Sequence, residues 1–163
     1  MIEDLASWPP MAPVLGGYAA FLGGVALYDA RRRRIPNAAV YPALAVALGL
    51  AFLRPDGPWW SFLLAGLVAG ALFLVLGIVS PGGMGMGDAK LAAVIGLMAG
   101  WPAVLAALFF SFATGALGGL ALIAAGRIGR REPIPFGPAL AVGALVAIIA
   151  GRPLAHLLWP GIA

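Results

Sequence analysis

The sequence predicts an all-α fold: a polytopic membrane bundle of about six transmembrane helices with its N-terminus outside. Of its 163 residues, 63% are apolar types and only 10% are charged, and the mean hydropathy is +1.02. Ordinary soluble domains carry about 25% charged residues, and a domain this small cannot bury so much apolar surface in a core of its own. Lipid must therefore cover the outside, which excludes a soluble enzyme, a disordered tail and a disulfide scaffold.

The first half of the chain contains three apolar runs, each bounded by polar or turn-forming residues. A helix needs about 20 apolar residues to cross the hydrocarbon layer. The first run ends at Asp29 and the arginines 31–34, and the second ends in the turn-forming segment 54–58. The third run opens with Trp59 and Trp60, which suit the membrane interface.

The second half begins with a glycine-rich stretch, residues 80–88, which does not favour a stable helix. The apolar run 89–126 is too long for one span, and it divides at Gly100-Trp101-Pro102 because proline disfavours helix before it. A basic stretch, 127–135, precedes the last run. We therefore expect a single domain, residues 1–163, with helices at about 11–28, 38–53, 59–79, 89–100, 102–126 and 136–151.

The basic residues indicate the orientation, because cytoplasmic loops of membrane proteins carry an excess of Lys and Arg. With the N-terminus outside, 8 of the 10 basic residues fall on the inner side, and only Arg54 and Arg152 fall outside. Merging the fourth and fifth helices would move three arginines outside, so six spans fit better. Residues 1–10 carry two acidic residues and no basic ones, so we expect no signal peptide.

The composition also restricts the chemistry. The chain has no Cys and one His, His156, which excludes thiol catalysis, thiolate zinc sites and a multi-histidine metal site within one chain. We expect no metal and no cofactor. The basic residues gather at the ends of apolar runs, so they indicate topology and contact with lipid rather than binding of nucleic acid.

Two of the six acidic residues, Asp29 and Asp88, are expected at the cytoplasmic mouths of apolar helices. Ionisable groups at membrane depth are costly and usually face protein or a water-filled cavity. Both lie on one side of the predicted bundle, so they can meet. Two carboxylates in one site share a proton, so one can act as a base toward water while the other acts as an acid. Such a pair hydrolyses peptide bonds without metal, Cys or His.

Other interpretations of these two residues are open. Asp88 could cap the helix that follows it, and Asp29 could pair with one of the arginines 31–34. A small transporter or channel would use the pair as a proton or cation relay. A non-catalytic subunit of a secretion or pilus-assembly machine would need neither carboxylate for chemistry.

Three segments carry a resemblance to a known family. Residues 85–90, Gly-Met-Gly-Asp-Ala-Lys, resemble the GxGD-x-K signature of the type IV prepilin peptidases and archaeal preflagellin peptidases. Residues 29–37 resemble the family's D-x4-5-IPN segment, and residues 134–138 resemble its late IPFGP segment. The three stand in the family's order on the predicted inner face, and the resemblance covers nearly the whole chain.

The resemblance implies an intramembrane aspartyl endopeptidase of the bacterial cytoplasmic membrane whose site faces the cytoplasm. Asp29 and Asp88 match the family's two catalytic aspartates, and Gly85 and Gly87 match its motif glycines, where close backbone approach suits glycine. The implied partners are prepilin and pseudopilin precursors, each with a short basic leader before a hydrophobic helix. Neither the individual precursors nor the oligomeric state can be read from the sequence.

One departure from the family separates this chain from its larger members. Those members carry an inserted cytoplasmic domain, often with paired CxxC motifs, that is linked to N-methylation of the new terminus. This chain has no Cys and short inner loops. It resembles the compact, peptidase-only form of Flp/Tad pilus systems, so methyltransferase activity is not expected.

Other motif residues are expected to shape the site. Lys90 either holds Asp88 charged or extends to lipid headgroups. Pro135, Phe136, Gly137 and Pro138 set the entry of the last helix. Glu132 is either a solvated loop acid or a contact for the basic leader.

The predicted orientation is testable because the chain contains no Cys. In a Gly83→Cys variant, a membrane-impermeant maleimide should label the protein only from the cytoplasmic side. Labelling only from outside would overturn the topology.

Overall fold

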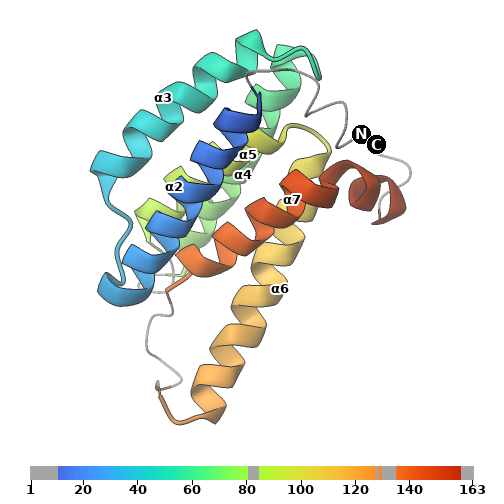
Figure 1. The fold of residues 1–163 in the computed structure, drawn as a ribbon. Helices are drawn as coiled ribbons and strands as arrows, with labels where there is room; N and C mark the ends of the chain where they lie inside the picture. Colours follow the sequence, from blue (N-terminus) through green and yellow to red (C-terminus); the bar gives the residue numbers. More distant parts are fainter. Residues whose placement is uncertain (1–10, 81–84, 128, 130–134, 159–163) are drawn as a thin grey trace.

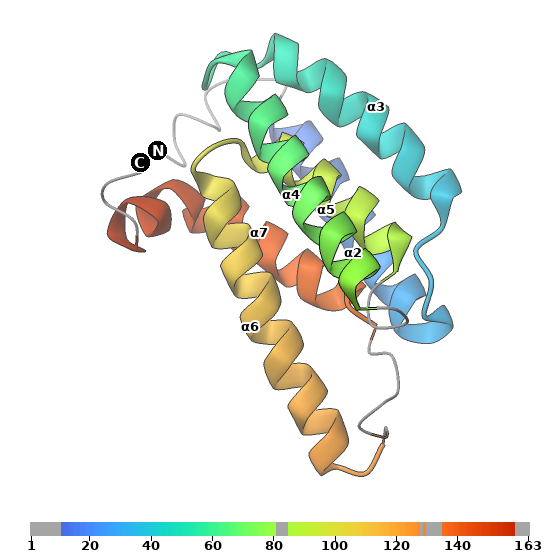
Figure 2. The ribbon, with the colours of Figure 1, turned by 180° about the vertical axis from the view of Figure 1, so that it is seen from behind.

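The computed structural model describes residues 11–80, 85–127, 129 and 135–158. Over these residues the chain is helical and contains no strand (Figures 1 and 2). The helices are α2 (Met11–Arg32), α3 (Asn37–Leu53), α4 (Trp59–Val79), α5 (Met86–Ala99), α6 (Ala103–Ala124) and α7 (Gly137–Leu158). The sequence predicted these helices in this order, and α4 has the predicted bounds.

α2, α5 and α7 are longer than predicted by two or more residues, α3 begins one residue early, and α6 is shorter than the predicted 102–126. α2 continues to Arg32, since arginine is a good helix former, and it ends where Arg33 has a left-handed φ of 52°. Asp29 therefore lies in the last turn of α2 rather than after it. α5 begins at Met86, so that Asp88 belongs to its first turn, and α7 runs on to Leu158 with Pro153 inside it.

The helices pack around α5, which lies in the interior in both views (Figures 1 and 2). Nine of its 14 residues are buried. α4 packs along one side of α5, α3 and α7 also contact it, and α7 packs against α6 and α2. The C-terminal half of α6 extends beyond the other helices (Figures 1 and 2). α5 is therefore the element through which the other helices are positioned.

The outer surface suits lipid contact, because large apolar side chains cover much of it. On α4 alone, Leu67, Ile78 and Val79 are each more than 60% exposed. α4 and α6 are long and apolar enough to cross a membrane, and α3 and residues 137–150 of α7 are shorter apolar helices. α5 is only about 21 Å long at the rise of an α-helix. A membrane bundle is consistent with these helices, while six spans and an outside N-terminus stay predictions.

Glycines allow α4 and α5 to pack closely. A Cβ at Gly96 would lie 2.3 Å from the Ala65 carbonyl oxygen, and a Cβ at Gly66 would lie 2.7 Å from the Leu97 side chain. Gly118 on α6 differs, because a Cβ there would meet nothing within 4 Å. The close approach of α4 and α5 thus depends on particular glycines and not on the abundance of glycine.

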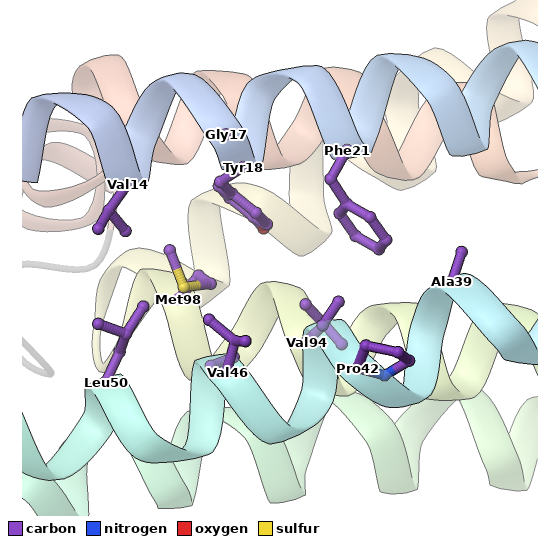
Figure 3. Close-up of a pocket in the computed structure, with 12 residues that line it drawn as sticks. Val14, Gly17, Tyr18, Phe21, Ala39, Pro42, Val46, Leu50, Val94 and Met98 are labelled. Carbon is purple, nitrogen blue, oxygen red and sulfur yellow. The ribbon is translucent and has the colours of Figure 1, made fainter.

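A cavity of about 330 Å³ lies between α2, α3 and α5 (Figure 3). Its walls are apolar, and side chains such as Val14 and Phe21 of α2 face Pro42 and Val46 of α3 across it (Figure 3). The Tyr18 hydroxyl is the one buried side-chain polar atom without a hydrogen-bond partner in the described part of the chain. The cavity separates α2 from α3 along much of their length.

We expect Gly96→Ala to destabilise the protein, because its methyl group would displace the α4 backbone at Ala65. Forcing a methyl group into packed structure costs about 1–3 kcal/mol. Thermal unfolding in detergent should show a lower Tm. The control is Gly118→Ala, which should leave the Tm unchanged or raise it, since Ala favours helix over Gly. Equal Tm values for the two variants would contradict this account.

Candidate active site

Asp29 lies in the last turn of α2, and its side chain is buried, with 4% exposure. Its Oδ2 accepts a hydrogen bond of 2.9 Å from the backbone N–H of Gly137, which is 108 positions away in the sequence. Gly137 is the first residue of α7, and the first N–H groups of a helix have no partner within it. A Cβ at Gly137 would lie 2.8 Å from Asp29 Oδ2, so glycine allows the two segments to meet.

Asp88 lies in the first turn of α5 with 8% exposure. Its Oδ2 accepts a hydrogen bond of 2.9 Å from the backbone N–H of Gly85, the residue before the helix. This is one half of a capping box, in which the third helical residue caps the N-terminus. Glycine has no side chain to complete the other half. Asp88 therefore does cap the N-terminus of α5, but it does so as the third residue of the helix rather than as the residue that precedes it.

The two carboxylates lie at the same end of the bundle, which we call the aspartate end. There α2 ends while α5 and α7 begin (Figures 1 and 2). Each carboxylate is also held by an N–H at a helix start, where the helix dipole favours negative charge. The fold thus combines two buried carboxylates with main-chain donors that fix their orientation.

The IPN segment also packs at the aspartate end. A Cβ at Gly87 would lie 2.8 Å from the Ile35 Cβ, so this motif glycine allows the loop after α2 to contact α5. Gly85 has an extended backbone with φ −83° and ψ 148°. Neither motif glycine thus needs a left-handed conformation, and the reason for glycine at 87 is space.

Lys90 contacts α3. Its ammonium group donates hydrogen bonds to Asn37 Oδ1 at 3.0 Å and to the Tyr41 hydroxyl at 2.9 Å. It also lies 4.7 Å from the centre of the Tyr41 ring. Sequence reasoning missed Tyr41, although it lies one helical turn after Asn37 in an otherwise apolar run.

The described part of the IPFGP segment, residues 135–138, also contributes to packing, in addition to the hydrogen bond from Gly137 to Asp29. The Phe136 ring lies 5.6 Å from Phe73 of α4 and 5.7 Å from Phe112 of α6, measured between ring centres. A Cβ at Gly115 would lie 2.4 Å from this ring. Pro135 and Pro138 are half-buried on either side. Glu132 lies outside the described residues.

Asp56 forms an ion pair with Arg54 at the opposite end of the bundle. The Arg54 guanidinium donates to both carboxylate oxygens of Asp56, with 2.9 Å from Nε to Oδ1. Arg54 also donates to the Met98 carbonyl oxygen at 2.6 Å, near the end of α5. In the described residues, no three His, Cys, Asp or Glu side chains gather in a way that could hold a metal ion.

Comparison with known proteins adds a family relationship. A model of the type IV leader peptidase family matches residues 17–120, a range that contains both aspartates. A prepilin leader peptidase/N-methyltransferase of Bacillus subtilis (strain 168) is 41% identical over 128 residues, which are 78% of this chain and 51% of the relative. A protein of the same name from Burkholderia pseudomallei (strain 1026b) is 31% identical over 170 residues, covering 94% of this chain and 52% of the relative.

The chain thus spans about half the length of these curated relatives. No solved structure matches it.

The capping bond of Asp88 can be separated from its charge. Asp88→Asn keeps a side-chain oxygen that can accept from Gly85, whereas Asp88→Ala removes the acceptor. Loss of a helix cap costs about 0.5–2 kcal/mol. Unfolding in detergent should therefore show the alanine variant to be less stable than the asparagine variant. An alanine variant as stable as the asparagine variant would mean that the bond contributes nothing.

Proposed function

The chain belongs to the type IV leader peptidase family, and from this premise we propose that it is an intramembrane aspartyl endopeptidase. It cleaves the short basic leader from type IV prepilin-like precursors at the cytoplasmic face of the bacterial inner membrane. The observation that carries the proposal is the position of Asp29 and Asp88 at one end of the bundle, buried and each held by a main-chain N–H.

The mechanism uses the two carboxyl groups in different protonation states. Two carboxylates in a poorly hydrated site resist ionising together, so the pair holds one proton. The ionised aspartate takes a proton from water, whose oxygen attacks the carbon of the scissile peptide carbonyl. The protonated aspartate gives its proton to the carbonyl oxygen. When the tetrahedral intermediate collapses, the aspartate that took the water proton gives it to the leaving amine, and the other aspartate takes a proton back from a hydroxyl group of the intermediate. The C–N bond breaks, and the pair again holds one proton.

The main-chain donors support this division of roles. The N–H groups of Gly85 and Gly137 bond Oδ2 of their carboxylates, so Oδ1 is the oxygen that the mechanism assigns to water and substrate. Rigid placement of catalytic groups contributes strongly to rate, because reacting atoms must lie about 3–3.5 Å apart. Glycine at 137 allows this contact, since a side chain there would press on Asp29.

The proposed substrate class is the one that the family implies, and the position of the site is compatible with it. Prepilin and pseudopilin precursors have a leader that stays in the cytoplasm and a hydrophobic helix that enters the bilayer. A site at the inner end of a lipid-exposed bundle can receive the peptide bond between those two parts. Exposed apolar side chains along α4 and α6 leave the hydrophobic helix a route through lipid to the bundle.

The names of the relatives include N-methyltransferase, but we assign only the peptidase activity to this chain. The sequence has no Cys, whereas the domain linked to methylation in larger family members often carries paired CxxC motifs. The proposed reaction needs no cofactor or metal, and the groups that perform it are the two carboxyl groups.

Asp29→Asn and Asp88→Asn should each abolish cleavage, because an amide can neither take nor return the proton. Loss of general acid–base catalysis lowers a rate by about 10²–10⁴-fold. The measurement is the mass shift of a co-expressed Flp-type prepilin, with membrane insertion of each variant checked separately.

The matched control is Asp56→Asn, which changes a carboxylate at the opposite end and should leave cleavage intact. Normal cleavage by either site variant would refute the assignment of the pair. A transporter would instead show no cleavage with the unsubstituted chain and partial function after Asp→Glu substitutions.

A further inference from the structure

A polar contact connects the two segments that carry the aspartates. Lys90 lies two residues after Asp88 on α5, and Asn37 is the first residue of α3, eight residues after Asp29. Tyr41 lies one turn further along α3. The Lys90 ammonium donates to Asn37 Oδ1 at 3.0 Å and to the Tyr41 hydroxyl at 2.9 Å, and it lies 4.7 Å from the centre of the Tyr41 ring. We call these three residues the polar clamp.

The location of Lys90 makes this contact informative. A cation in the first turns of a helix opposes the helix dipole, so Lys90 gains nothing from its place at the start of α5. The clamp offsets that cost, because two oxygens receive ammonium N–H groups and the aromatic face attracts the cation. The contacts are formed across helices, so they also fix α3 against α5.

α3 packs directly against α5, and the polar clamp is the hydrogen-bonded part of that interface. An apolar cavity separates α2 from α3, and its lining includes Ala39, near the start of α3 (Figure 3). Ile35 packs against Gly87, and the clamp lies directly beyond it along the chain. The segment from Asp29 to the start of α3 therefore contacts α5 twice in succession, first through the apolar contact of Ile35 with Gly87 and then through the polar clamp.

We propose that Asn37 and Tyr41 are positioning residues that act through Lys90 to hold the Asp29 segment in register with Asp88. This inference rests on the proposed peptidase function for its kinetic consequence, but its geometric consequence is independent of any reaction. Neither residue acts on the scissile bond. Their effect is on the relative placement of the two carboxyl groups.

The geometric test uses the absence of Cys in the chain. Spin labels at R34C and M86C, both exposed positions on the two segments, report their separation in purified protein without substrate. We expect a narrow distance distribution in the parent pair. Asn37→Ala, Lys90→Met and Tyr41→Phe should each broaden it, and Asn37→Ala combined with Lys90→Met should broaden it no further than Lys90→Met alone.

The matched control is Tyr28→Phe, which removes a hydroxyl from an exposed tyrosine at the same end. It should leave the distribution unchanged. Tyr41→Phe is the decisive variant if the others fold poorly, because it keeps the ring and removes one oxygen atom. A parent-like distribution in Tyr41→Phe and Asn37→Ala would overturn the proposal.

The kinetic test follows cleavage of a prepilin by the same variants without labels. Misplacement of catalytic groups by about 1 Å can cost up to 100-fold, so kcat should fall about 10- to 100-fold while KM stays within about twofold. Lys90→Arg, which keeps the positive charge, should have a higher kcat than Lys90→Met but a lower kcat than the parent. Broadened distances with a parent chain that never cleaves would refute the proposed function alone. Unchanged distances and unchanged kcat in a cleaving enzyme would refute the clamp alone.

Discussion

The structure depends on one constraint: two carboxylates must be buried at one end of a very apolar bundle. A buried charged group is tolerated only with hydrogen-bond donors close by. The chain supplies those donors from its backbone, with the N–H of Gly85 at the start of α5 and the N–H of Gly137 at the start of α7. The start points of both helices are thereby tied to the positions of Asp88 and Asp29, and the rest of the bundle must keep these starts together.

α5 meets this requirement because it is fixed along its length and at both ends. Glycines at 66 and 96 let α4 approach its backbone. At the aspartate end, Ile35 packs against Gly87, and the Lys90 ammonium donates a hydrogen bond to Asn37 of α3. At the opposite end, Arg54 donates to the Met98 carbonyl oxygen. A short interior helix can thus hold a carboxylate in one orientation.

The sequence predicted the helices and their order, because charged residues are few and most of them lie near helix ends. It did not predict the bounds of α2 and α5, because arginine continues a helix readily and a glycine-rich stretch hides a helix start. It also did not predict the partners of Lys90 and Asp56, which come from another helix and from turn geometry that hydropathy does not encode. The Gly137 contact with Asp29 spans 108 positions. The late IPFGP segment placed Gly137 near the site by resemblance, but no spacing rule identifies its N–H as the donor.

The most direct test of the account is mass spectrometry of a Flp-type prepilin incubated with the purified protein in lipid vesicles, with no other component added. The account predicts a product that has lost the leader, with no added methyl group at the new terminus. An intact precursor after incubation with folded protein would contradict the central claim that two carboxyl groups at one end of this bundle suffice for peptide hydrolysis.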